Sequence, residues 1–495
     1  MRLEGRAMAE RVPSDVEIVI VGSGFAGLGA AVKLDEAGRP DYVILEKDDA
    51  LGGTWRDNDY PGCACDVESY LYSFSFRPNP NWTRTFARQP EIWDYLEDIA
   101  DHYRLRDRIH FGARVVGAEW DGSRWEVRIA DGSTVRARFV IWGTGALHVP
   151  SIPEIDGLDR FAGTAFHSAR WDHSHDLRDR RVAVIGTGAS AIQFVPAIAP
   201  GVASLTLFQR TAPWVLPKPD RPISDRTRRL TARFPVLQKL IRWKLYWQHE
   251  MLVAGFLNPR FMTLIARFGR RCLDRAFAGA PALKAELTPT FTIGCKRILL
   301  SNDYYPTLRR DNVTVETGDI ARITENGVVT ADGVEHEVDT IIFGTGFKVG
   351  DGMAQVAVTG RGGVKLVDAW RDGSQALLGT TVAGFPNLFL VVGPNTGLGH
   401  SSMIYMIESQ LNYILDALRV VDRHGATAID TVAERQDAFN AEIQSRLENA
   451  VWSQGGCVSW YLDEHGRNRT LWPGSTFSFR RRTRRIDPAD HELLV

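Results

Sequence analysis

The sequence has few cysteines and almost no net charge. The first absence argues against a disulfide-stabilised protein, and the second argues against a protein that binds nucleic acid or anionic membranes through its overall charge. Only 5 of its 495 residues are cysteine. This odd, scattered set predicts buried thiols in a reducing compartment rather than a disulfide framework, and the close pair Cys63-Ala-Cys65 lacks the further ligands of a metal site. A formal net charge of -1 provides no overall field that would attract nucleic acid or an anionic membrane.

The chain also lacks segments that would place it across a membrane. No run is long and apolar enough to span a bilayer, and the first dozen residues contain Glu4 and Glu10 but no apolar signal-peptide core. With 44% hydrophobic and 24% charged residues, the composition is that of a globular protein, and the length predicts two or three domains. We therefore predict a cytoplasmic protein, and its near-zero net charge is compatible with a small uncharged substrate.

A glycine-rich loop near the start predicts a first dinucleotide site. Residues 17–21 form a β-branched run, Gly22-Ser-Gly24-Phe-Ala-Gly27 follows at once, and residues 28–34 have helical composition. Gly22 permits the turn, Gly24 lets the backbone approach a pyrophosphate, and Gly27 lets the helix pack on the strand. The next predicted strand ends in Glu46, whose carboxylate can accept hydrogen bonds from a ribose and would repel a 2′-phosphate. This pattern favours FAD or NAD.

A second loop of the same kind carries a different preference. Residues 181–185 lead into Gly186-Thr187-Gly188-Ala-Ser190-Ala191, with alanine at the third close-packing position, and a helix is predicted over residues 192–198. The following strand, residues 204–208, is followed by Gln209-Arg210-Thr211 rather than by an acid. Because arginine can bind a phosphate through two hydrogen bonds, this site is predicted to prefer NADPH to NADH.

Residues 235–268 form a basic and aromatic stretch that includes Arg242, Trp243 and Lys244. Two interpretations are open: a helix lying on a membrane surface, or a long amphipathic helix that covers an active site. We favour the second, because residues 212–290 interrupt the alternation of strands and helices, and their apolar faces suit the wall of a hydrophobic pocket. The basic run at residues 480–485 is predicted to be a solvated terminus.

A longer motif lies at the seam before the second loop: Phe161-Ala-Gly163-Thr-Ala-Phe-His167-Ser-Ala-Arg-Trp171-Asp172. Its spacing, Phe-x-Gly-x-x-x-His-x-x-x-Trp-Asp, resembles the fingerprint of type I Baeyer-Villiger monooxygenases. Gly52-Gly53-Thr54-Trp55 with residues 60–72, and Phe291-Thr-Ile-Gly-Cys-Lys296-Arg297, resemble the same family. The resemblance spans nearly the whole chain and departs at Cys63-Ala64, where the family usually has Ala-Arg or a similar pair.

This resemblance implies an enzyme that passes electrons from NADPH to FAD and then to O2. Its C4a-peroxyflavin would convert a small hydrophobic ketone into an ester or lactone. The implied catalytic residues are Arg297, whose cation would keep the peroxide anionic and nucleophilic, and Asp66, which would orient that cation. Because it lies on the segment that enters the predicted NADPH domain, His167 is predicted to be a hinge or an interdomain contact rather than a catalytic base.

The predicted fold class is α/β, with two Rossmann-like dinucleotide-binding domains and a helical insertion in the NADPH domain. The FAD domain is predicted over residues 1–150 and 347–495, the NADPH domain over 151–211 and 296–346, and the insertion over 212–295. The predicted flavin-side contacts are Gly22, Gly24, Gly27, Glu46, Gly53, Thr54, Trp55, Asp66, Tyr72, Val115 and Met403. The predicted nicotinamide-side contacts are Gly186, Thr187, Gly188, Ser190, Ala191, Gln193, Arg210, Thr211, Lys296 and Arg297.

Other functions stay open on the residues alone. A related flavin monooxygenase would oxidise amines or sulfides through a protonated hydroperoxide, and a redox sensor would hold FAD and NADP without turnover. Two residues also have local alternatives. Asp66 suits the N-cap of a helix over residues 67–71, and His400 has the chemistry of a general base but is predicted to be structural.

Overall fold

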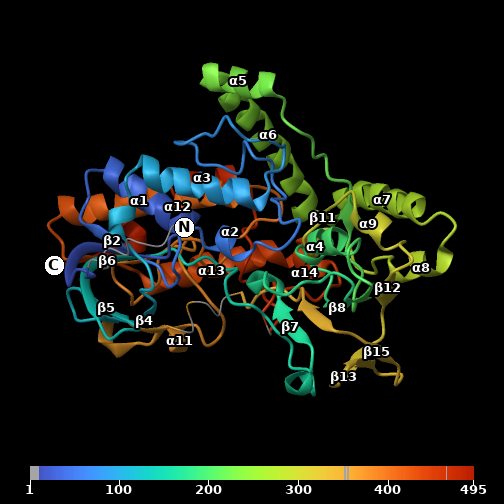
Figure 1. Cartoon of the computed structure of the whole chain (residues 1–495). Coiled ribbons are helices and arrows are strands. Elements are labelled where there is room, and N and C mark those ends of the chain that lie inside the picture. The colour runs from blue at the N-terminus through green and yellow to red at the C-terminus, as the bar shows by residue number, and fades with distance from the viewer. Residues whose placement is uncertain (1–10, 350–352, 354–355, 464) are drawn as a thin grey trace, which may run out of the picture.

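Each glycine loop joins a buried strand to the helix that covers it. In the computed structural model, which describes residues 11–349, 353, 356–463 and 465–495, β1 (Asp15–Val21) leads into α1 (Phe25–Glu36). In the same way, β8 (Arg181–Ile185) leads into α4 (Ala191–Ile198). Both predicted strand, turn and helix units are therefore confirmed (Figure 1).

The first loop belongs to an eight-stranded sheet of order β17-β4-β5-β6-β1-β2-β3, with β18 beside β6. Its centre is parallel, and Ile20 of β1 lies between Ile44 of β2 and Ile141 of β6. Strands β4 to β6 are antiparallel, and residues 125–142 form a hairpin of β5 and β6. The further strands are β2 (Tyr42–Leu45), β3 (Ile109–His110), β4 (Val115–Trp120), β5 (Trp125–Ile129), β6 (Thr134–Trp142), β17 (Ala357–Thr359) and β18 (Leu388–Leu390).

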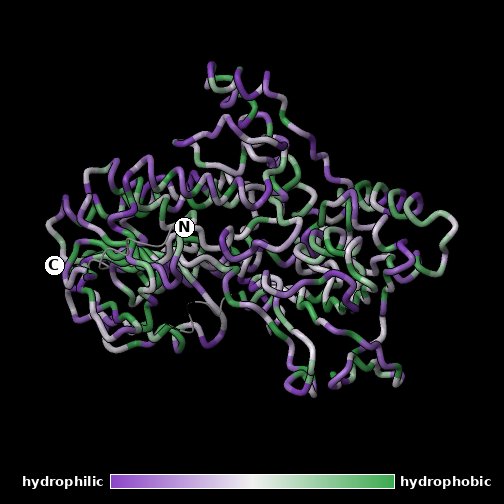
Figure 2. The backbone as a smooth tube through the Cα atoms, in the orientation of Figure 1, coloured by the Kyte–Doolittle hydropathy of each residue, from purple (hydrophilic) through white to green (hydrophobic). Residues whose placement is uncertain are grey.

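The second loop belongs to a five-stranded, wholly parallel sheet of order β12-β9-β8-β16-β7. Its further strands are β7 (Thr164–His167), β9 (Ser204–Phe208), β12 (Val313–Glu316) and β16 (Thr340–Phe343). Hydrophobic residues gather along the strands of both sheets (Figure 2). The predicted fold class, α/β with two dinucleotide-binding domains, is confirmed.

The chain passes twice between the two domains, and the two passages lie side by side. The first follows β6 and the second follows β16. Ser151 donates its backbone N–H to the Gly346 carbonyl at 2.9 Å, and Lys348 donates to the Val149 carbonyl at 2.9 Å. Pro150 and Phe347 form an antiparallel bridge between these bonds. The two passages are thus a short two-stranded ribbon.

Each passage also begins with a glycine that packs against one of the loops. A Cβ added to Gly22 would lie 3.0 Å from the Gly143 carbonyl oxygen, and one added to Gly186 would lie 2.5 Å from the Gly344 oxygen. Both loop glycines have positive φ angles, 96° and 107°. Residues 143–145 and residues 344–346 both read Gly-Thr-Gly, and the first glycine of each packs in the same way against its loop.

The helical segment is broken where a single helix was predicted over residues 235–268. It contains α5 (Asp225–Arg233), α6 (Pro235–Leu257), α7 (Pro259–Ala276) and α8 (Pro281–Glu286). The break falls at Asn258, because a proline at the next position disfavours helical backbone before it and removes a hydrogen-bond donor. Asn258 instead accepts a hydrogen bond from the N–H of Arg260 at 3.2 Å and starts α7. In Figure 1, α5 and α6 project from the top of the molecule.

The C-terminal part returns to the first domain. There α12 (Met403–Arg423) packs against α1. The remaining helices and strands are α2 (Thr54–Asp57), α3 (Gln89–His102), β10 (Val215–Leu216), β11 (Leu299–Leu300), α9 (Tyr304–Thr307), β13 (Ile320–Ile323), β14 (Gly327–Thr330), β15 (Glu335–Glu337), α11 (Leu366–Ala369), β19 (Ala428–Thr431), α13 (Ala433–Glu448), α14 (Val451–Gln454), α15 (Thr476–Arg482) and β20 (His491–Leu494).

Candidate active site

An ion pair joins the two residues predicted to be catalytic. Nε of Arg297 lies 2.5 Å from Oδ2 of Asp66, and Nη2 lies 2.8 Å from Oδ1. This fork places the guanidinium in one plane with the carboxylate, which is the strongest geometry available to the pair. Arg297 comes from the segment before β11 and Asp66 from the loop before α3, so the pair joins the two domains.

The pair fixes the charge of both groups. Burial would raise the pKa of Asp66, but the Arg297 charge and hydrogen bonds outweigh burial and hold that pKa below its ordinary value. The Asp66 charge raises the pKa of Arg297 further, despite burial. Arg297 is therefore a permanent cation held by a permanent anion.

Two neighbours of this pair were missed in the sequence. The Lys218 ammonium donates to the Cys65 carbonyl at 2.9 Å and lies close enough to Asp66 to help keep it ionised. The hydroxyl of Tyr461, from the C-terminal part, lies near Arg297, and burial raises the pKa of this tyrosine to about 12. Neither lies in a motif, and the only signal was the aromatic composition around Tyr461.

The alternative role of Asp66 as a helix N-cap is wrong, because residues 67–71 form turns rather than a helix. The backbone here bonds to another segment instead: Cys65 donates to the Ala87 carbonyl at 2.9 Å and Ser69 to the Thr85 carbonyl at 2.7 Å. The Asp66 carboxylate is consequently free to bind Arg297.

The predicted flavin-side residues surround the first loop. Glu46 is buried and accepts from the N–H and hydroxyl of Ser23, at 2.8 and 2.6 Å, and from the N–H of Asp48 at 3.1 Å. A carboxylate accepts about four hydrogen bonds, so Glu46 braces the loop and keeps capacity for one ribose hydroxyl. Trp55 donates to the Tyr72 hydroxyl at 3.0 Å, and both rings lie in the same core.

The other predicted flavin contacts are backbone positions or helix ends. Gly53 precedes α2, which begins at Thr54. A Cβ added to Gly24 would lie 3.8 Å from the Cα of Gly53. Val115 begins β4, where it is buried, and half-buried Met403 begins α12. Their contacts with a cofactor stay predictions.

Two predicted nicotinamide contacts instead join the domains. The Gln193 side chain accepts from the Tyr60 hydroxyl at 3.1 Å and the Ala64 N–H at 3.2 Å, and donates to the Ala64 carbonyl at 3.0 Å. Ser190 also bonds to the Tyr60 hydroxyl. The structure thus gives both residues an interdomain role, while their contact with a cofactor stays a prediction.

The remaining second-loop residues keep their predicted places. Ala191 packs tightly, because a Cβ added to Gly344 would lie 3.2 Å from the Cβ of Ala191. A Cβ added to Gly188 would lie no nearer than 3.6 Å to any protein atom. The Thr187 hydroxyl donates to the Thr211 carbonyl at 3.2 Å and closes the loop. A small residue at position 191 is therefore required by packing.

Two cations lie together beyond this loop. Burial and the nearby Arg210 charge both lower the pKa of Lys296. Within the part of the chain that the structure describes, neither side chain has an ion-pair partner. The Lys296 ammonium lies over the Phe291 ring, 5.2 Å from its centroid. Adjacent cations without a carboxylate partner attract anions, and the contacts of both residues with a cofactor stay predictions.

The fingerprint lies at the edge of the second sheet, beside the ribbon. His167 ends β7, is buried, accepts the N–H of Ala169 at 3.1 Å and packs edge-on against Phe347 at 5.7 Å. A Cβ added to Gly163 would lie 2.4 Å from the backbone carbonyl oxygen of Asp339. The predicted interdomain contact of His167 is present, and its action as a hinge stays a prediction.

The other fingerprint residues either pack against apolar side chains or accept hydrogen bonds from a neighbouring residue. Trp171 packs against Phe166 and Phe194, with ring centroids 5.2 and 5.4 Å apart, and Phe161 packs on the core of the second sheet. Asp172 accepts from the N–H and hydroxyl of Ser174, at 3.0 and 2.5 Å. These three residues therefore hold the fingerprint within the second domain, and His167 is its contact with the ribbon.

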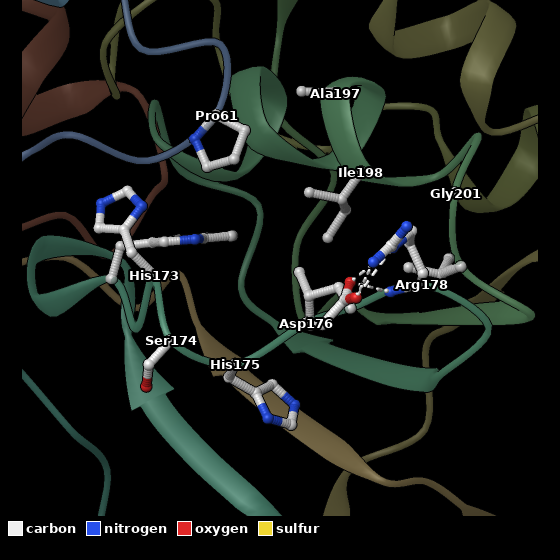
Figure 3. Close-up of a pocket in the computed structure, with 12 residues that line it drawn as sticks. Pro61, His173, Ser174, His175, Asp176, Arg178, Ala197, Ile198 and Gly201 are labelled. Atoms are coloured by element: carbon white, nitrogen blue, oxygen red, sulfur yellow. Dashed lines mark hydrogen bonds and ion pairs between the residues drawn. The ribbon is translucent and has the colours of Figure 1, made fainter.

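A hollow of about 530 Å³ lies beside the fingerprint (Figure 3). Its wall includes Pro61 of the first domain, Trp171 and His173, and Ile198 at the end of α4. Asp66, Lys296 and Arg297 do not line it. This hollow is consequently separate from the ion pair.

A histidine on α6 attaches the helical segment to the loop that carries Asp66. Nδ1 of His249 lies 2.5 Å from the His400 carbonyl, and Nε2 lies 2.7 Å from the Glu68 carboxylate. The His400 ring itself is buried, 3.5 Å from Glu250, and its structural role stays a prediction. Burial lowers the pKa of His249, but the bond to Glu68 and the charges of Glu68 and Asp66 outweigh burial, so the net pKa is raised.

This clamp predicts a pH dependence of stability. A raised pKa in the folded state means that His249 stabilises the protein fully below its ordinary pKa of about 6.5 and loses that contribution as pH rises through the folded pKa. As pH rises through this window, we expect the free energy of unfolding to decrease by on the order of 1 kcal/mol. The thermal midpoint should fall with it. His249→Gln should flatten the dependence, and a midpoint equally pH-dependent in the variant would contradict the assignment.

The prediction that all five cysteines are thiols is wrong. Cys295 and Cys457 form a disulfide that joins the segment before Arg297 to the C-terminal part, while Cys63, Cys65 and Cys272 are free. Burial raises the pKa of the Cys63 thiol to about 12, so this thiol is inert. No cluster of metal ligands occurs within the described residues.

Removing the disulfide should destabilise the protein. Cys295→Ser with Cys457→Ser opens a loop of 162 residues, and we expect a loss of about 2–4 kcal/mol in the free energy of unfolding. Denaturant unfolding measures this, with Cys272→Ser as the matched control because that thiol is free. Equal stability of the double variant and the control would contradict the prediction.

Comparisons with known proteins fit this geometry. Residues 19–229 match the family described as pyridine nucleotide-disulphide oxidoreductase. The chain is 51% identical to a Baeyer-Villiger monooxygenase of Pseudomonas aeruginosa, over 97% of this chain and 92% of that protein. It is 50% identical to a Baeyer-Villiger monooxygenase of Streptomyces coelicolor, over 98% and 94%.

Solved structures agree. The chain superposes with a TM-score of 0.88 on cyclohexanone monooxygenase from Rhodococcus sp. Phi1 bound to NADP+, at 29% identity over 98% of this chain and 100% of that one. The score is 0.87 for OTEMO in complex with FAD and NADP, at 27% identity over 97% and 99%. Near-complete coverage at half identity settles the family: the chain belongs to the Baeyer-Villiger monooxygenases.

Proposed function

We propose that this enzyme uses NADPH, FAD and O2 to convert small hydrophobic ketones into esters or lactones, and that it works in the cytoplasm. The forked ion pair between Arg297 and Asp66 carries the proposal. Membership of the family supports it, as do the FAD and NADP bound by a structural neighbour.

The first loop fits the pyrophosphate of FAD. Helix α1 starts at Phe25 without a side-chain cap on its first turn, so its amide donors are available to phosphate. A Cβ on Gly24 would meet no protein atom nearer than 3.8 Å, which leaves room for a ligand over the backbone. Glu46 would accept a ribose hydroxyl.

The second loop fits NADPH. Helix α4 also starts without a side-chain cap on its first turn, and Arg210 and Lys296 supply the uncompensated charges that a 2′-phosphate would neutralise. The absence of an acid at the strand end removes the repulsion that Glu46 would exert on such a phosphate.

Arg297 and Asp66 then have distinct tasks. Reduced FAD, when bound, activates oxygen for insertion into the ketone. The guanidinium of Arg297 would stabilise the negative charge that develops during the transfer, and because Asp66 holds it by two bonds, it needs no reorganisation. Lys218 and Tyr461 support the same pair from two other segments.

Product analysis tests the function. The FAD-loaded enzyme, NADPH and a panel of cyclic and aryl ketones should give NADPH oxidation and products heavier by one oxygen atom in mass spectrometry. Oxidation of a thioether without any ketone product would favour the sulfide-oxidising alternative. An absence of oxygen-dependent NADPH consumption with every ketone would favour the redox sensor.

The cofactor preference gives a second test. Arg210→Ala should raise the KM for NADPH by roughly 10- to 100-fold and leave the KM for NADH unchanged, since a hydrogen bond to a charged group contributes about 1.5–3 kcal/mol. Arg178→Ala is the matched control, because Arg178 lies in the same domain and pairs with Asp176. Equal effects on both cofactors would contradict the assignment of Arg210.

A further inference from the structure

Helices α6 and α7 leave a row of large apolar side chains exposed. On α6 the row consists of Val236, Leu240, Trp243, Trp247 and Met251, with Leu237 and Leu252 exposed beside it, and on α7 the exposed residues are Phe261, Leu264 and Phe268. The exposed fractions reach 62% for Trp243 and 70% for both Met251 and Leu264. The α6 residues of the row recur every three or four positions and therefore share one face of the helix.

The opposite face of α6 packs on the body of the protein. Tyr246 stacks on Tyr405 at 4.9 Å, and the Arg242 guanidinium donates to the carbonyls of Tyr70 and Leu71 at 3.0 Å. With His249 bonded to Glu68, this face holds α6 in place. The predicted covering role is consistent with this inner face, and the outer face is left without a function.

The charge around the exposed row is strongly positive. Residues 225–276 contain 12 lysines and arginines and 3 acids, a local excess of 12 − 3 = 9 in a chain whose net charge is -1. Of these acids, Glu250 is buried, Asp225 pairs with Arg228, and Asp274 pairs with Lys284. The cations Lys239, Lys244 and Arg267 are exposed. Apolar side chains bordered by cations are the composition of helices that lie on a membrane surface.

We propose that the outer face of α5 to α7 docks on the surface of a membrane containing anionic lipids. The exposed tryptophans and phenylalanines would enter the interface between head groups and acyl chains, and the cations would bind lipid phosphates. Among the described residues no helix is long and apolar enough to cross a membrane, so the contact is peripheral. Docking does not depend on the proposed reaction.

A second copy of the chain is a poorer occupant of this face. A two-fold interface would place the same patch on both sides and bring two cationic surfaces together, with like charges opposed at the rim. Anionic lipids instead supply the missing negative charge. The charge pattern therefore selects the membrane.

Vesicle co-sedimentation of the FAD-loaded enzyme tests the proposal. We expect binding to vesicles of phosphatidylcholine and phosphatidylglycerol in equal parts, at least tenfold weaker binding to pure phosphatidylcholine, and further weakening with added salt. Trp243→Ala with Trp247→Ala, and separately Lys239→Glu with Lys244→Glu, should each weaken binding at least tenfold.

Matched controls come from the far side of the molecule, where α11 and β13 lie at the bottom of Figure 1. Val364→Ala with Val367→Ala removes exposed apolar groups, and Arg322→Glu with Lys365→Glu reverses exposed charges. Both controls should bind like the wild type. Bound FAD and the thermal midpoint verify that every variant is folded.

Three results would overturn the proposal: no binding to the mixed vesicles at low salt, equal binding to both vesicle types, or equal loss in the test and control variants. A concentration-dependent dimer that protects Trp243 and Trp247 and excludes vesicles would also overturn it and assign the face to a second copy.

Discussion

Replacing Arg297 by alanine should reduce ketone oxygenation by roughly 100- to 1,000-fold while NADPH oxidation continues and releases hydrogen peroxide. The physical reason is the loss of the one cation that Asp66 holds by two hydrogen bonds. Without it, oxygen would still be reduced, but no fixed positive charge would stabilise its transfer to the ketone. Ester formation, NADPH consumption and peroxide release, measured together, separate these steps.

Two further variants sharpen this test. Arg297→Lys keeps the charge but loses the planar fork, so an intermediate activity is expected. Arg84→Ala is the matched control, because Arg84 forms a comparable, partly buried pair with Asp220 at 2.7 Å. Ester formation at the wild-type rate in Arg297→Ala would show that the cation has no part in the transfer.

Two glycine variants of the first loop should both abolish FAD binding, for different reasons. A Cβ on Gly27 would lie 1.8 Å from the Gly22 carbonyl oxygen, so α1 would have to move off β1. We expect Gly27→Ala to lose bound FAD and about 3 kcal/mol or more of stability, since backbone atoms must shift. A Cβ on Gly24 meets no protein atom nearer than 3.8 Å, so Gly24→Ala should fold normally yet exclude the pyrophosphate.

The flavin absorbance of the purified proteins and their thermal unfolding without added FAD distinguish the two effects. Gly201→Ala serves as the control, because the nearest atom to its Cβ would be 3.8 Å away and it lies at the far end of α4. Full FAD content in Gly24→Ala would contradict the assignment of that glycine, and unchanged stability in Gly27→Ala would contradict the packing argument.

The sequence was sufficient wherever structure depends on neighbours along the chain. Strands β1 and β8, their glycine loops and helices, and the hairpin of β5 and β6 follow from local patterns of burial and turn chemistry. Asp66 and Arg297 were found because each lies in a long motif, although 231 residues separate them.

The rest depends on contacts between distant segments that leave no local pattern. Lys218 reaches Cys65 across 153 residues, and Cys295 reaches Cys457 across 162, so neither pairing could be inferred from spacing. The expected helix after Asp66 failed for a related reason, because Cys65 and Ser69 donate their backbone N–H groups to the segment around Ala87 and only a turn at Glu68 closes locally. Gln193 was predicted to contact the nicotinamide cofactor from the start of its helix, yet its side-chain amide donates to the Ala64 carbonyl of the other domain.

The ribbon between the domains determines how they can move. Its two strands are held by the bonds from Ser151 to Gly346 and from Lys348 to Val149, with the Pro150 and Phe347 bridge between them. Twisting one strand about the other would break these bonds, whereas bending both together preserves them. Movement of one domain against the other should therefore follow a single angle about the ribbon, so that Arg210 moves along one fixed arc, whereas Lys296 stays near the first domain because its neighbour Arg297 is bonded to Asp66.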